Sequence, residues 1–160
     1  MQTLLIRPSE ITGFTPLGGN VDIDKYLPCI LDVQVTVIEP LLGEKLYDKI
    51  LVDFEADNLD GNYEILYNEY LKPILRHQVF AEYVEIGSYT VSNAGIYKHA
   101  PEDSEVVSKD EVQYLAQIHR SKSQLYIDRA KKWLGKNLIS EYRGHGCSGG
   151  TLKTASGWHF

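Results

Sequence analysis

His145 and Cys147, two positions apart near the end of the chain, are the residue types of a nucleophile and its base. A catalytic cysteine needs that base within hydrogen-bond reach on a rigid frame. The segment 139–160, which carries both residues, holds five glycines and few aliphatic side chains, so it cannot form a core. We therefore expect a flexible tail with an incidental thiol and no nucleophilic catalysis.

The histidines and the glycine-rich stretch offer no stronger site. A structural zinc ion needs about four grouped Cys or His ligands, and no two histidines share a predicted element at ligand spacing. The five are His77, His99, His119, His145 and His159. His119 lies on the apolar face of the last predicted helix, where we expect a hydrogen-bonded core or interface histidine. The run 17–20, Leu-Gly-Gly-Asn, lacks the lysine and spacing of a phosphate-binding loop. The sequence thus predicts no enzyme, no metal and no cofactor.

Two acidic clusters remain, one at residues 53–57 and one that contains Glu102, Asp103 and Glu105. Neither has the neighbours that would bury a carboxylate pair and shift its pKa. A solvated acidic surface is the plain interpretation. A second interpretation stays open, because an acidic loop suits the wall of a DNA channel, where like charges keep the phosphate backbone from adhering.

The hydrophobic pattern that must position these residues is mostly helical. It predicts four helices, whose approximate ranges are 23–38, 40–54, 63–86 and 108–138. Pro40 suits a first helical position, whereas Pro28 and Pro73 should bend the helices that contain them. Residues 3–6 suit a short strand or an extended arm. Over 88–107 the helical period stops, which predicts a long loop or a loose β-hairpin.

The last helix is the clearest of these predictions. Ser108 and Glu111 form a capping box, in which each side chain accepts a hydrogen bond from the other residue's backbone N–H. Apolar residues then follow one face for about 30 residues, which makes a helix about 45 Å long. One small core cannot cover that length, so we expect part of the helix to face another chain.

Together these elements predict a mainly α protein. It is a bundle of about four helices with a long C-terminal helix, an extended or hairpin-like loop and a flexible C-terminal tail. We place one helical domain at residues 1–138, with its loop at 88–107, and the tail at 139–160.

Composition agrees with a soluble globular chain. The 160 residues are 43% hydrophobic, which suffices for one core. Sixteen basic and 22 acidic residues give a net charge of −6, which argues against a general nucleic-acid binder. Two distant cysteines, no membrane-length apolar run and no signal-peptide pattern favour a reducing compartment. Eleven tyrosines against four phenylalanines suit half-buried protein interfaces.

Several segments resemble a family of small tailed-bacteriophage proteins, the head–tail connector or head-completion adaptors. The versions in crAss-like phages and related phages of gut bacteria are the most similar. The most specific segments are Pro-Leu-Leu-Gly…Leu-Tyr over 40–47 and Gly-Ile-Tyr-Lys-His over 95–99. The resemblance covers about residues 3–138.

The resemblance implies a structural role without catalysis. Adaptors of this family form a ring beneath the portal, usually of about twelve copies, that extends the DNA channel and joins capsid to tail. Their partners are their own copies, the portal protein, and tail or further ring proteins. Double-stranded DNA passes without sequence-specific binding, and no membrane is involved. The protein would be made in the host bacterial cytoplasm and reside in the neck of the virion.

The resemblance also implies three sets of site residues. A loop that projects into the channel would contribute Asn93, Lys98, Glu102, Asp103 and Glu105. A C-terminal segment that grips the portal would contribute Tyr142, Arg143, Trp158 and Phe160. Ring contacts join two different faces, so we place a subunit interface on apolar residues off the core-facing stripe of the last helix, namely Tyr114, Ile118 and Leu125.

One alternative fits the same helical pattern. A helical protein-interaction module or an assembly chaperone would share the bundle and form no ring.

Overall fold

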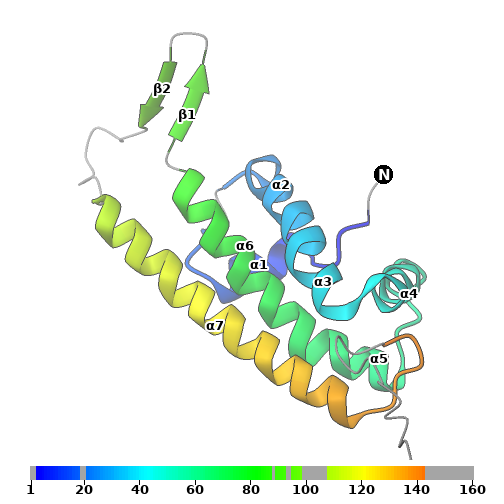
Figure 1. The fold of residues 1–160 in the computed structure, drawn as a ribbon. Helices are drawn as coiled ribbons and strands as arrows, with labels where there is room; N and C mark the ends of the chain where they lie inside the picture. Colours follow the sequence, from blue (N-terminus) through cyan, green and yellow to red (C-terminus); the bar gives the residue numbers. More distant parts are fainter. Residues whose placement is uncertain (1–2, 19–20, 88, 93–94, 99–107, 143–160) are drawn as a thin grey trace, which may run out of the picture.

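The computed structural model describes residues 3–18, 21–87, 89–92, 95–98 and 108–142 (Figure 1). It is mainly helical and ends in a long helix, which confirms the predicted fold class. The helices are α1 (Pro8–Phe14), α2 (Ile23–Val33), α3 (Glu39–Leu42), α4 (Glu44–Glu55), α5 (Gly61–Leu66), α6 (Lys72–Ile86) and α7 (Lys109–Lys136), with π-helical turns η1 (Gln34–Ile38) and η2 (Tyr67–Leu71). The strands are β1 (Tyr89–Ser92) and β2 (Gly95–Lys98). None of the described helices is long and apolar enough to cross a membrane.

Each π turn ends two residues before a proline: η1 precedes Pro40 and η2 precedes Pro73. The N–H of Glu39 donates to the carbonyl of Gln34, five residues back, just before Pro40. A proline has no N–H and its ring crowds the carbonyl four residues earlier, so a widened turn absorbs both defects. The prediction that Pro40 opens a second helix was therefore wrong. The helix continues to Leu42 and ends at Gly43, whose φ of 76° favours glycine.

The third predicted helix also accommodates its proline with a π turn. The N–H of Lys72 donates to the carbonyl of Tyr67, and Pro73 then lies in the first turn of α6. The chain thus runs helically from Gly61 to Ile86 with one widened turn in place of a break.

The segment after α6 forms the predicted hairpin over its described part. Strands β1 and β2 pair antiparallel, with Tyr89 opposite Lys98 and Ser92 opposite Gly95. In Figure 1 the hairpin extends beyond the end of α6, away from the other helices.

Helix α7 begins at the predicted capping box. The Glu111 N–H donates to Ser108 Oγ at 3.3 Å, and the Ser108 N–H donates to Glu111 Oε2 at 2.9 Å. The helix has 28 residues, which corresponds to about 42 Å. It packs along α6 and η2, and it buries Ala130 and Leu134 against the main core.

The N-terminal arm enters the core without joining a sheet. Leu5 and Ile6 are fully buried. The buried Gln34 side chain accepts from the Leu5 N–H at 2.7 Å and donates to the Thr3 carbonyl at 3.0 Å. Tyr67 Oη donates to the Leu5 carbonyl at 2.8 Å. The first residues of both π turns therefore hold the arm in place by side-chain hydrogen bonds.

The packed domain continues beyond the predicted boundary at residue 138. Ile139 is buried, and Tyr142 packs against the core. Tyr63 Oη donates to Glu141 Oε2 at 2.7 Å. The predicted tail start was therefore four residues too early, because a few well-placed side chains suffice to dock a short polar segment. The remainder of the predicted tail, 143–160, lies outside the described residues.

Candidate functional site

The outer face of α7 carries the strongest candidate surface. Tyr114 is 71% exposed and Leu125 is 59% exposed, while Ile118 is partly exposed. Residues four and seven positions apart share one side of a helix. The three side chains therefore line the side opposite the buried residues, which are Ala116, His119, Ser123, Ala130 and Leu134.

Arg120 borders this surface and ties α7 to α6. Its guanidinium makes two hydrogen bonds to the carboxylate of Glu85, one of them at 3.0 Å. The Arg120 hydrogen bond and its charge hold the pKa of Glu85 below its ordinary value. Glu85 and Arg120 line an open depression together with Tyr114. The helix pair presents this part of the surface as a rigid unit.

A histidine pair lies on the inner side of the same helix. His119 Nδ1 is 3.1 Å from His77 Nδ1 of α6, and Phe80 packs on the His119 ring. Burial lowers the pKa of His77 to about 4, and the charges of His119 and Lys122 act in the same direction. Burial and Lys122 also lower the pKa of His119.

The pair confirms that His119 is a hydrogen-bonded core histidine, but the sequence did not show its partner. His77 is 42 residues away, and only the register between α6 and α7 brings the rings together. Two rings do not make a metal site by themselves. Within the described residues no group of three or more His, Cys, Asp or Glu side chains is placed to hold a metal ion.

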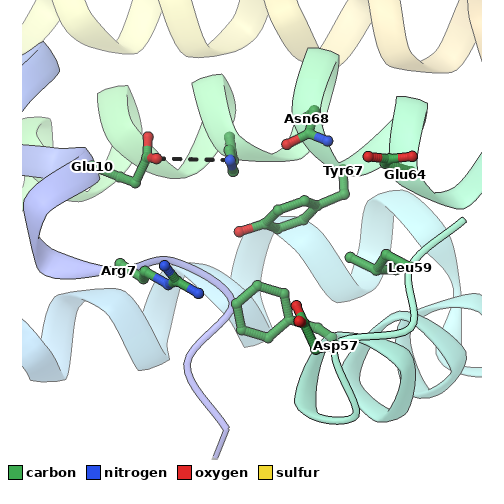
Figure 2. A pocket seen from close by; sticks show the side chains of 9 residues that line it. Arg7, Glu10, Asp57, Leu59, Glu64, Tyr67 and Asn68 are labelled. Atoms are coloured by element: carbon green, nitrogen blue, oxygen red, sulfur yellow. Dashed lines mark ion pairs between the residues drawn. The ribbon is translucent and has the colours of Figure 1, made fainter.

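A second hollow lies where the N-terminal arm meets α1, α4, η2 and α6 (Figure 2). It has a volume of about 250 Å³ and is lined by Arg7, Glu10, Phe54, Asp57, Leu59, Glu64, Tyr67, Asn68 and Lys72. Glu10 forms ion pairs with Lys72 at 3.7 Å and with Arg76. Arg76 and Lys72 hold the pKa of Glu10 below its ordinary value. The ion pairs of Glu10 thus fasten α1 to α6.

A protein-family model matches residues 38–150, which run from the last residue of η1 to beyond the end of α7. The matching family is DUF6712, a family of unknown function. The chain belongs to the DUF6712 family. No curated protein and no solved structure matches it.

Some of the predicted site residues of this DUF6712 protein lie in the described part of the chain, and the others lie outside it. Tyr114, Ile118 and Leu125 share one exposed face, as described above. Tyr142 is partly buried against the core, because the chain folds back onto α5 before it leaves the bundle. Lys98 ends β2 opposite Tyr89. The other predicted residues lie outside the described part of the chain; they are Asn93, Glu102, Asp103, Glu105, Arg143, Trp158 and Phe160, together with His145 and Cys147.

Two titratable side chains are buried, and one of them, Asp53, differs from the sequence-based expectation. Asp53 belongs to an acidic cluster expected to be solvated, yet it is buried, and Lys49 Nζ lies 2.5 Å from its carboxylate. Cys29 is a buried free thiol whose pKa is raised to about 11, mainly by burial. A thiol with a raised pKa stays protonated and is a poor nucleophile.

Proposed function

We propose that this DUF6712 chain is a structural subunit of the connector between the head and tail of a tailed phage. Copies would stand side by side in a ring of about twelve beneath the portal, extend the DNA channel and carry the tail. The chain would perform no catalysis. The proposal combines the resemblance of residues 3–138 to such adaptors with the shape of the described bundle.

The observation that carries the proposal is the exposed face of α7. Large apolar side chains that line up on a rigid helix favour burial against another protein. Tyr114 and Leu125 expose 71% and 59% of their surface, respectively. A ring subunit needs such a face on its neighbour-facing side, where contact with the next copy would remove these side chains from water.

The hairpin and the chain end are proposed to line the channel and to dock on the portal, respectively. The β1–β2 hairpin extends from the bundle in Figure 1, as an element that reaches into a channel would. Its loop and the following residues, Asn93 to Glu105, are proposed to line that channel. Because Tyr142 packs on the core, the segment free to dock on the portal would begin at Arg143 and include Trp158 and Phe160.

Light scattering on a sizing column tests the proposal. The 18.1 kDa chain is run alone and with the portal protein encoded by the same genome. A species of about twelve copies, or a stoichiometric shift of the portal peak, is the expected result. A monomer that leaves the portal peak unchanged would contradict the proposal and favour a helical interaction module or chaperone.

A further inference from the structure

Charge is distributed unevenly between two helices of the bundle. Helix α7 carries seven Lys or Arg residues and three Asp or Glu residues. Helix α4 carries four Asp or Glu residues and two lysines. The spacing of the residues places most of the basic side chains of α7 and most of the acidic side chains of α4 on the exposed side of each helix.

On α7 the basic residues form a continuous stripe. Its members follow one another in steps of three or four residues, so they share one side of the helix. We call this set the basic stripe: Lys122, Leu125, Arg129, Lys132 and Lys136, all of them exposed. It continues the line of Tyr114 and Ile118 toward the C-terminal end of α7.

On α4 the exposed carboxylates form a second stripe. We call this set the acidic stripe: Glu44, Asp48, Val52 and Glu55, all of them exposed. Val52 at its centre is 65% exposed. Lys45 lies at the edge of the stripe, whereas Lys49 is turned to the buried Asp53. Within the described chain, no charged member of either stripe has an ion-pair partner.

The two stripes are similar in composition and length. Each has one aliphatic side chain among charges mostly of one sign, Leu125 in one and Val52 in the other, and each is bordered by one exposed opposite charge, Asp128 on α7 and Lys45 on α4. The basic stripe spans about 21 Å and the acidic stripe about 16 Å along their helices. Figure 1 shows α7 along one edge of the molecule and α4 at another, with α5 between α4 and the C-terminal end of α7, and within the described residues no ion pair joins the two stripes of one copy.

We infer that the basic stripe of α7 packs against the acidic stripe of α4 in the next copy of the chain. This inference rests on the proposed function, and it names both sides of the contact between neighbours. Leu125 then packs on Val52, and the surrounding lysines and Arg129 face the carboxylates. The two faces differ, so each copy keeps one free face of each kind and the contact repeats around a ring.

Paired charge reversals test this contact in the full-length chain. One variant carries Arg129→Glu with Lys132→Glu, and the other carries Asp48→Lys with Glu55→Lys. Each alone should assemble roughly tenfold or more weakly by light scattering, because like charges then oppose each other. An equal mixture should assemble again, because each variant offers the face that the other lost. Assembly that survives in both separate variants would overturn the inference.

Matched controls separate the contact from net charge. Lys25→Glu with Lys109→Glu changes the charge as the α7 variant does, and Asp24→Lys with Glu69→Lys changes it as the α4 variant does. All four control residues are exposed and lie off both stripes. Both control proteins should assemble as the wild type does. A loss of assembly in the controls equal to that in the stripe variants would also overturn the inference.

Cysteine cross-linking then fixes the direction of the contact. In a Cys147→Ser background, Leu125→Cys combined with Val52→Cys should give a ladder of covalent oligomers on oxidation. Leu125→Cys alone should remain uncrosslinked. A covalent dimer from Leu125→Cys alone would show two α7 helices packed on each other and would overturn the inference while self-association stands. A wild-type chain that stays monomeric at every concentration, with and without the portal, would overturn the proposed function as well.

Discussion

The His77–His119 contact depends on the protonation state of two side chains. Their Nδ1 atoms are 3.1 Å apart, so one ring donates a proton and the other accepts it. If both rings were protonated, two N–H donors and two positive charges would face each other. Lys122 of α7 and Arg76 of α6 add further positive charge nearby, and burial lowers the pKa of both rings. The folded state therefore favours neutral imidazoles at this point of the α6–α7 contact.

The first prediction is a loss of stability in acid that originates in this pair. An unfolded histidine titrates near pH 6.5, whereas His77 titrates at about 4 in the folded chain. The unfolded chain binds the proton first, so this contribution is complete above about pH 6.5 and is lost as the pH falls toward 4. Between those values the wild type should lose about 2 kcal/mol from this source, measured by urea unfolding at each pH.

The control for that prediction removes both rings' titration while it keeps an apolar ring at each position. His77→Phe with His119→Phe should be less dependent on pH by the same amount, because a pair of matched apolar groups leaves no buried donor unsatisfied. Glu10 and Glu85, whose pKa values the fold lowers and which therefore also reduce stability in acid, remain in both proteins and cancel in the comparison. Parallel pH profiles for the two proteins would contradict the assignment.

Among the elements, the two π turns show how the chain keeps long helices despite its prolines. Gln34 and Tyr67 each begin a π turn, and each uses its side chain to hold the N-terminal arm. The widened turns thus serve two purposes, because they accommodate Pro40 and Pro73 and they direct a polar side chain into the core. The real end of the first long helix is the glycine at position 43.

The second prediction concerns Gly43, which separates α3 from α4. Gly43 has φ of 76° and ψ of 152°, a conformation that is nearly restricted to glycine, and open space surrounds its Cα. Gly43→Ala should cost about 1–3 kcal/mol through backbone strain alone. Gly13→Ala, inside α1 and equally uncrowded, should instead stabilise by about 0.5–1 kcal/mol. Thermal unfolding of the two variants checks the opposite signs, and a similar shift for both would refute the argument.

The sequence predicted what depends on local spacing. The capping box at Ser108 and the exposed positions of Tyr114 and Leu125 follow from residues a few positions apart on one helix. The His77–His119 contact required the register between two helices, which a hydrophobic pattern does not contain. The helix end at Gly43 was missed because Pro40 looked like a stronger signal, and the π turn that accommodates it leaves no obvious mark in the sequence.

For the whole molecule, the packed domain extends to Tyr142, so a truncation before that residue removes core contacts. Ile139 and Tyr142 belong to the core, and Glu141 is tied to Tyr63. A chain that ends after Leu138 should therefore lose about 2–3 kcal/mol of stability, mainly from the exposed core at Ile139. A chain that ends after Tyr142 retains all of these contacts, so its urea unfolding should match that of the full-length protein.

The same two truncations separate folding from docking. If residues 143–160 grip the portal, the chain that ends after Tyr142 should fold normally and still fail to shift the portal peak on a sizing column. Its own assembly should persist, because both stripes and the exposed face of α7 are intact. Portal binding that is unchanged without Trp158 and Phe160 would contradict the docking role of the chain end. That result would leave the contact between neighbouring copies to be judged by the charge reversals.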